Sequence, residues 1–98
     1  MKIPDKVKIG GLIYTVEQTE SISLGQDYYG ETDYTNLKMS IRPCNTSRME
    51  AVFIHEILHG IHDILGYSKQ DEKKIEELAN ALYALIVDNP EMFSAGGD

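Results

Sequence analysis

The first half of the chain alternates hydrophobic and polar residues, the pattern of strands that bury one face. In residues 6–17 apolar side chains recur at every second position on both sides of Gly10 and Gly11. Glycines tolerate the positive φ angles of a tight turn, so this segment is predicted to form a β-hairpin. A second alternating run, residues 37–42, predicts another strand, and residues 28–33 would pair with it as a second hairpin.

The second half of the chain changes to the 3.6-residue period of amphipathic helices. Residues 47–50 begin with Ser and end with Glu, a capping box that predicts a helix running to Leu65 with Gly66 at its C-terminal cap. Residues 68–71 repeat the capping relation with Ser and Asp. A second helix is therefore predicted from there to the Asn-Pro pair at 89–90.

These elements predict an α+β fold, in which a small antiparallel sheet of two hairpins packs on a helical hairpin. The chain has 98 residues, enough for one modest hydrophobic core and too few for a comfortable pair of domains. Residues 1–91 are therefore predicted to be a single domain and residues 92–98 a flexible tail. The domain is expected to fold alone or as a small oligomer.

Charge and N-terminal sequence narrow the classes of partner. The 9 Lys and Arg residues against 16 Asp and Glu give a net charge of −7, which disfavours binding to nucleic acid. The N-terminus has no basic region followed by an apolar run, and no later segment has membrane-spanning length. A cytoplasmic protein without membrane contact is expected. Cys44 is the single cysteine, so an internal disulfide is excluded.

The strongest chemical signal is the run His-Glu-Ile-Leu-His at residues 55–59. On a helix, the spacing of four places His55 and His59 one turn apart and roughly 40° apart around the axis, so both imidazoles can meet one Zn²⁺. Glu56 lies about 100° from His55, too far round to join the same coordination set easily. It is instead well placed beside a metal-bound water whose proton it can take.

The position of the motif on its helix argues against a chance match. His55, His59 and His62 form one stripe, on nearly the opposite side from the apolar positions of the same helix. The alternative is a polar helix face that happens to carry histidines, but such a face is more often filled by Lys, Glu and Gln. The apolar stripe consists of Phe53, Ile54, Ile57, Leu58, Ile61, Ile64 and Leu65.

A catalytic zinc normally has three protein ligands, so a third is needed from elsewhere. If the two helices form an antiparallel hairpin turning near Tyr67, the midpoint of His55 and His59 lies level with residue 77. Glu76 and Glu77 are the carboxylates at that level. Glu76 sits at the edge of the apolar stripe of its helix and Glu77 points away from it, so Glu76 is the predicted third ligand.

Other side chains near the motif are weaker candidates. Glu72 is one turn closer to the loop and is expected to lie level with His62. His62 itself would strain a tetrahedral site if one helix supplied all three imidazoles, so a role at the rim is preferred. Tyr67 and Tyr83 could donate to a developing oxyanion, although tyrosines at such positions more often pack with a wet hydroxyl.

Together these residues resemble the small gluzincin-like proteins of phages and prophages, related to the ImmA/IrrE type of metallopeptidase. That wider family takes its third ligand from the Glu of an ExxAxxFA helix, and Glu76, Ala79 and Leu82 match this frame. There are two departures from the family pattern: Leu58 stands where the wider family usually has a small residue, and Leu82-Tyr83 stand in place of the final Phe-Ala. They would narrow the site and leave the ligands intact. The resemblance covers most of the chain: IPDKVKIGG (3–11), YTV (14–16), YGETD (29–33), HEILHG (55–60), LANALY (78–83) and DNP (88–90).

Two functions are compatible with these residues. The first is a zinc-dependent metallopeptidase that cleaves a protein or peptide substrate, with the substrate strand pairing to a sheet edge at residues 36–42. The second is a non-catalytic binding module of phage or prophage origin, which zinc staples and whose acidic surface engages a protein partner. Glu56 favours the peptidase, because a purely structural site has no use for a base and usually has four protein ligands.

Overall fold

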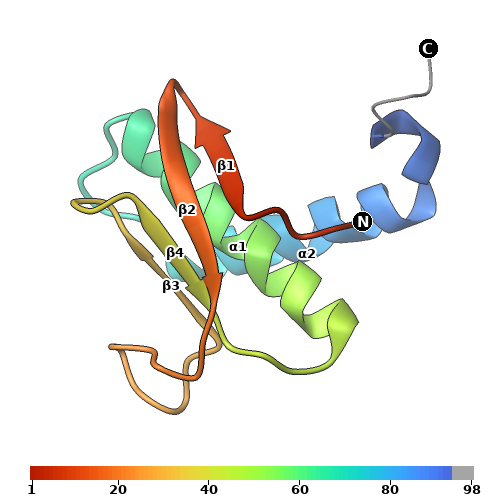
Figure 1. Ribbon diagram of the computed structural model, residues 1–98. Helices are drawn as coiled ribbons and strands as arrows, with labels where there is room; N and C mark the ends of the chain where they lie inside the picture. Colours follow the sequence, from red (N-terminus) through yellow and green to blue (C-terminus); the bar gives the residue numbers. More distant parts are fainter. Residues whose placement is uncertain (94–98) are drawn as a thin grey trace.

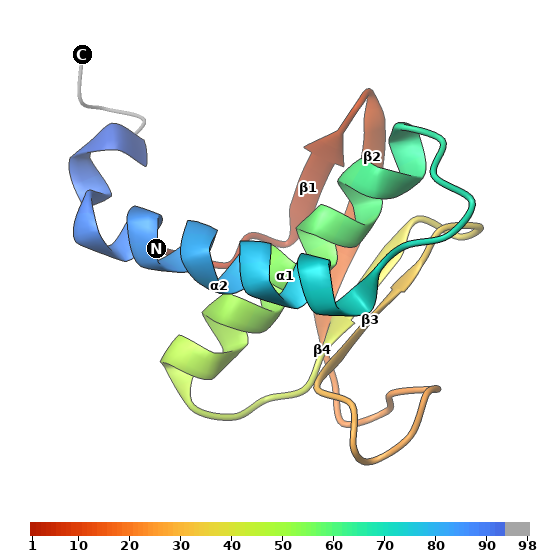
Figure 2. The same ribbon diagram turned by 180° about the vertical axis from the view of Figure 1, so that it is seen from behind.

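A four-stranded sheet lies against one helix, and a second helix crosses that helix on the side away from the sheet (Figures 1 and 2). The computed structural model describes residues 1–93. The packing of a sheet on helices confirms the predicted α+β fold. In chain order the elements are β1 (Lys6–Ile9), β2 (Leu12–Gln18), β3 (Gly30–Asp33), β4 (Lys38–Ile41), α1 (Thr46–Ile64), α2 (Glu72–Asp88) and the short 3₁₀ helix η1 (Pro90–Phe93).

Both predicted hairpins are present, and a parallel pair of strands joins them. The strand order is β1-β2-β4-β3, with β1–β2 and β3–β4 antiparallel and β2–β4 parallel, so the sheet is mixed. The prediction that residues 36–42 form an exposed edge is wrong, because β4 lies between β2 and β3. The long connection from Gln18 to Gly30 carries the chain across to the far edge, and β3 occupies that edge.

The core between the sheet and α1 depends on a close approach of the two layers. Tyr14, Met39 and Ile41 are fully buried on the sheet and belong to one cluster with Phe53 of α1. Gly60 lies where α1 comes nearest, and a Cβ there would stand 2.9 Å from the Cδ1 atom of Ile9. A glycine inside a helix costs about 1 kcal/mol relative to alanine, and here it gives the sheet side chains room to pack.

The two helices share a second, smaller core. Ile54 and Leu58 of α1 pack against Ile75 and Ala79 of α2, and all four side chains are buried. The helix α1 therefore contributes to both cores, with Phe53 in the sheet cluster and with Ile54 and Leu58 in the cluster shared with α2. Among the described helices none is both long enough and apolar enough to cross a membrane.

The start of α1 differs from the predicted capping box. Asn45 is the N-cap, and its side-chain oxygen accepts from the backbone N–H of Arg48 at 3.3 Å. Ser47 and Glu50 already lie inside the helix, so their capping role is wrong. Asn is one of the strongest N-cap residues, and its position two residues earlier decides where the helix begins. The predicted C-terminal end is confirmed, since Gly66 follows the C-cap with a φ of +84°.

The end of α2 agrees with the sequence, whereas the helix begins later than predicted, because one residue caps it in place of the predicted pair at positions 68 and 71. Asp71 is the N-cap and accepts from the backbone N–H groups of Lys73 and Lys74 at 3.1 and 3.2 Å. Ser68 is therefore not the cap. Asn89 is the C-cap, where the helix was predicted to finish. The helix η1 continues past the predicted domain limit at residue 91, and residues 94–98 of the predicted tail lie outside the described part of the chain.

Candidate metal centre

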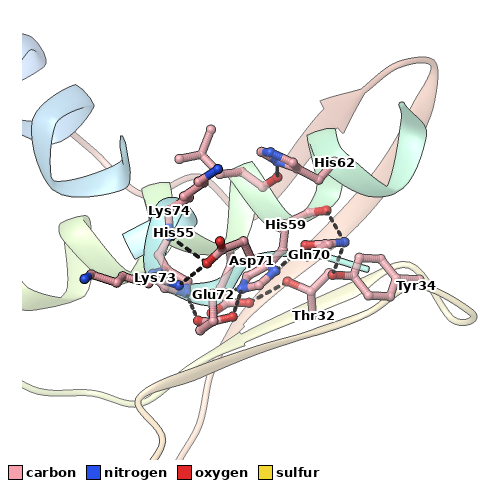
Figure 3. A network of polar contacts seen from close by, with 12 residues as sticks. Thr32, Tyr34, His55, His59, His62, Gln70, Asp71, Glu72, Lys73 and Lys74 are labelled. Atoms are coloured by element: carbon pink, nitrogen blue, oxygen red, sulfur yellow. Dashed lines mark hydrogen bonds and ion pairs between the residues drawn. The ribbon is translucent and has the colours of Figure 1, made fainter. Parts of the chain in front are cut away.

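The two histidines of the motif face each other on adjacent turns of α1. Their Nε2 atoms lie 3.1 Å apart, and their ring centroids are separated by 4.9 Å. The side chains of His55 and His59 are 22% and 15% exposed, so solvent reaches both. The convergence predicted from the helical spacing is therefore present, and both nitrogens lie on the surface that α2 approaches (Figure 3).

Glu72, the first residue of α2, brings a carboxylate to both imidazoles. Its Oε1 lies 2.7 Å from His55 Nε2, and its Oε2 lies 3.1 Å from His59 Nε2. Within residues 1–93 these are the three His, Cys, Asp or Glu side chains whose ligand atoms come close enough to share a metal ion. Tetrahedral zinc with Zn–N bonds of about 2.0–2.1 Å needs ligand atoms roughly 3.3 Å apart. The donor set fits zinc with small adjustments.

The carboxylate in this group is Glu72, whereas the sequence pointed to Glu76. The prediction that Glu72 lies level with His62 is wrong. It assumed a short turn between two helices that rise 1.5 Å per residue, but residues 65–71 are not helical and advance further per residue. They run back along α1, and the Nε2 atom of Gln70 already reaches the backbone oxygen of His59 at 3.3 Å.

Glu76 lies one turn further along α2, is exposed, and lines an open groove that His55, His59 and Glu72 also line. Glu77 is also exposed and is absent from the described lining of that groove. The predicted preference for Glu76 over Glu77 therefore agrees with the geometry, because only Glu76 of these two faces the groove. The role of Glu76 as a metal ligand stays a prediction. A metal titration that compares Glu72 with Glu76 decides between the two carboxylates.

Glu56 is almost completely buried, with 5% of its surface exposed, between α1 and β3. The Oγ1 hydroxyl of Thr32 donates to its Oε1 at 2.6 Å. Burial raises the pKa of the Glu56 carboxyl, while the Thr32 hydrogen bond and the nearby imidazoles oppose that shift. Glu56 lies beside the His pair without belonging to the three-residue group, which is the arrangement predicted from the helix.

Gly30 allows β3 to approach Glu56 closely. A Cβ at Gly30 would lie 2.6 Å from the Cγ1 of Val52 and 3.0 Å from the Oε2 of Glu56. Any side chain at this position would therefore displace the strand or the carboxylate. The sequence shows a glycine in a strand here, a signal that often marks a close backbone approach.

A second layer of polar contacts holds His59 (Figure 3). The Oε1 of Gln70 lies 2.5 Å from the Nδ1 of His59, and its Nε2 donates to the hydroxyl oxygen of Tyr34 at 3.3 Å. Gln70 comes from the loop before α2, and Tyr34 comes from the turn between β3 and β4. Neither of these residues, nor Thr32, could be predicted from the sequence, because no spacing rule connects these turns and strands with the motif.

The remaining candidates point elsewhere. The Nδ1 of His62 donates to the backbone oxygen of Leu58 at 2.7 Å, and the centroid of its ring lies 5.4 Å from that of Tyr67. His62 thus stands apart from the pair (Figure 3). The hydroxyl of Tyr83 donates to the Oε1 of Glu50 at 2.7 Å, away from the three-residue group.

An open groove of about 970 Å³ runs past the three donors, with α1 as its floor and β3 and α2 as its sides. Arg48 is two helical turns before His55 and holds its guanidinium 5.0 Å from the centre of the Tyr29 ring. Its volume lies at the upper end of the roughly 300–1,000 Å³ that is typical of ligand sites. Along α1 its lining consists of Arg48, Ala51, Val52, His55, Glu56 and His59.

Comparisons of this chain with protein-family models, with curated proteins and with solved structures found no match. The interpretation of the centre therefore rests on its own side chains. Two imidazoles, a carboxylate from a second helix and a buried glutamate meet at one open groove.

Proposed function

We propose that this protein is a zinc-dependent metallopeptidase. The observation that carries the proposal is the pairing of the donor set His55, His59 and Glu72 with a buried Glu56 that lies beside it and does not join it. Three protein donors are the usual number for a catalytic zinc, which keeps one position open. The resemblance to small phage metallopeptidases points to the same class of reaction.

The three donors would hold the metal from two helices. His55 and His59 would supply neutral imidazole nitrogens, and Glu72 would supply the negative charge. When bound, Zn²⁺ contributes Lewis acidity, which polarises a carbonyl group and lowers the pKa of water. The open groove lets a peptide reach this centre from solvent.

Glu56 is suited to act as the general base and acid of peptide hydrolysis. Thr32 occupies Oε1, and the missing side chain at Gly30 leaves space beside Oε2. In the proposed reaction Glu56 accepts a proton from the attacking water as the new C–O bond forms. It then delivers that proton to the amide nitrogen as the C–N bond breaks, so the products are a carboxylic acid and an amine.

The free edge of β3 is the proposed place for the substrate backbone. The backbone N–H of Arg42 donates to the oxygen of Tyr29 at 2.8 Å, which makes this a hydrogen-bonded pair at the start of the β3–β4 ladder. Because such pairs alternate along antiparallel strands, the backbone groups of Gly30 and Thr32 point away from β4. A peptide strand that pairs with them would lie in the groove beside Glu56.

The alternative function is a zinc-stapled binding module. It would use the same three donors, and the acidic surface would engage a protein partner. This function gives no role to a nearly buried carboxylate next to an open metal position. The peptidase therefore explains more of the described side chains.

The test uses the full chain, loaded with one equivalent of Zn²⁺, and its Glu56→Gln variant. Both are incubated with a pool of peptides from a digested proteome, and new termini are identified by mass spectrometry. The wild-type protein is expected to cleave a defined subset, and the variant is expected to keep its zinc and lose about 10²–10⁴-fold in rate. Full activity in a zinc-loaded variant would remove Glu56 from the mechanism.

An inactive wild-type protein with bound zinc would favour the binding module. Loss of zinc from Glu56→Gln would make Glu56 a ligand, which contradicts its proposed role. Thr35→Val serves as the control, because Thr35 lies outside the lining of the main groove and its side chain is exposed.

A further inference from the structure

The side-chain amide of Gln70 connects the imidazole of His59 with the hydroxyl of Tyr34. Its Oε1 contacts the Nδ1 of His59, and its Nε2 donates both to the Tyr34 hydroxyl and to the backbone oxygen of His59. A carbonyl oxygen can only accept, so the amide group that faces the backbone of His59 must be the NH₂. The orientation of the Gln70 amide is thus determined by its surroundings.

That orientation determines the tautomer of His59. Because Oε1 of Gln70 is an acceptor, the Nδ1 of His59 must carry the hydrogen. In the neutral imidazole that metal binding requires, the Nε2 of His59 then keeps its lone pair, and this is the atom that faces His55 and Glu72. A ligating imidazole needs this state, in which one nitrogen binds the metal and the other donates to a fixed acceptor.

The same amide also determines where the Tyr34 hydroxyl donates. The Nε2 of Gln70 takes an acceptor site on the phenol oxygen, so the phenol hydrogen is directed elsewhere. Tyr34 lines the groove that holds the three donors, and its side chain reaches toward Gln70 from the β3–β4 turn (Figure 3). Burial raises the pKa of Tyr34, so the phenol stays protonated and able to donate.

We infer that Gln70 is a positioning residue that couples the metal ligand His59 to Tyr34. It fixes His59 in the metal-binding tautomer and turns the Tyr34 hydroxyl toward the groove, where this hydroxyl donates to the oxyanion that develops on the scissile carbonyl. This inference rests on the proposed peptidase function, and Tyr34 is the catalytic donor within it. One side chain from the loop before α2 thereby positions both a metal ligand and the donor to the oxyanion.

Three variants separate the two halves of the coupling. Gln70→Leu removes all three contacts. Gln70→Glu keeps an acceptor for the Nδ1 of His59 and loses the donor to Tyr34 and to the backbone oxygen of His59, and Tyr34→Phe removes only the hydroxyl. Gln26→Leu is the matched control, because Gln26 is exposed and lies outside the described lining of the groove. Thermal unfolding of each variant confirms that it is folded.

The first readout is the tautomer of His59 in the metal-free protein, measured from side-chain ¹⁵N chemical shifts. Wild type and Gln70→Glu are expected to show the Nδ1–H form, and Gln70→Leu a mixture of tautomers. The zinc affinity, measured by competition with a chelator, should fall roughly 10–100-fold in Gln70→Leu and stay close to wild type in Gln70→Glu. A Gln70→Leu protein with wild-type tautomer and affinity would overturn the His59 half.

The second readout is the affinity of the zinc-loaded protein for acetohydroxamate, a small metal-binding anion whose oxygen can accept a hydrogen bond. Tyr34→Phe and Gln70→Glu should each weaken it by roughly 10-fold, and the double variant should lose no more than either single variant. Unchanged affinity in Tyr34→Phe, or additive losses, would overturn the Tyr34 half. Absence of zinc binding in wild type would instead defeat the proposed function, and the tautomer would still report on Gln70 and His59.

Discussion

The helix α1 and the segment that follows it contribute to the same site by different physical routes. His55, Glu56 and His59 are placed by the regular geometry of one helix, so their mutual positions follow from their spacing. Gln70 and Glu72 are placed by the path of an irregular loop that runs back along α1. The first group is a property of local sequence, and the second is a property of how the chain turns in three dimensions.

This difference explains why the carboxylate beside the histidine pair is Glu72, whereas the sequence pointed to Glu76. Counting residues from a turn works only when every residue advances by the same rise. Residues 65–71 are not helical, and they shift the level of α2 by about one turn relative to α1, so the first residue of α2 meets the histidine pair. A motif search finds the helix half of such a site more readily than the half that depends on a loop.

The largest expected effect tests the path of the loop. Glu72→Gln should weaken zinc binding by more than about 10–100-fold, the loss typical of removing an outer-sphere partner, because a charged donor is removed. Glu76→Gln should have a smaller effect, and Glu77→Gln should match wild type, since Glu77 is absent from the described groove lining. The measurement is a chelator competition with all three variants. A larger loss at Glu76 would restore the sequence-based ligand and show that α2 lies one turn further along.

A second prediction concerns the close approach of β3 to α1. Gly30→Ala should lower the free energy of unfolding by about 1–3 kcal/mol, because its Cβ would overlap Val52 and crowd Glu56. Gly60→Ala should change it by less than about 1 kcal/mol, since the nearest atom is the flexible end of Ile9 and alanine favours the helix. Urea unfolding of both variants checks the pair, and equal losses would contradict the special tightness at Gly30.

The smallest expected effect tests the local sequence signal that starts α1. Asn45→Ala should cost about 1 kcal/mol of unfolding free energy, because it removes the acceptor for the backbone N–H of Arg48. Ser47→Ala should stay within about 0.5 kcal/mol of wild type, since Ser47 is not the cap. Thermal unfolding measured side by side is sufficient. A greater loss at Ser47 would favour the capping box that the sequence predicted.

The sequence predicted which segments form strands better than it predicted which strands lie next to each other. Alternation identified both hairpins, because a half-buried strand must alternate whatever lies beside it. The parallel pairing of β2 with β4 leaves no such trace, since alternation does not say which strand is adjacent. The predicted substrate edge at residues 36–42 was wrong for this reason, and the free edge near the site belongs to β3.

In the candidate site, too, the sequence predicted the residues that one element relates and not those that tertiary packing brings together. His55, His59 and Glu56 could be predicted because the helical period relates them directly. Thr32 and Tyr34 reach the site from the sheet, more than twenty residues away from the motif in sequence, and only tertiary packing brings them there. Individual side chains with a hydroxyl group in strands and turns carry no periodic signal that would identify them as partners of a buried glutamate or of a distant glutamine.

The second core also has a consequence for how the protein responds to its metal. Among the described elements α2 contacts only α1 and η1, so a small cluster around Ile75 and Ala79 holds it in place. An ion shared by His55, His59 and Glu72 would fasten α2 to the rest of the domain, and free ion at 100 times its dissociation constant adds about 2.7 kcal/mol to the folded state. Chelation should therefore speed amide hydrogen exchange in α2 before it does so in the sheet, which makes this helix a reporter of occupancy.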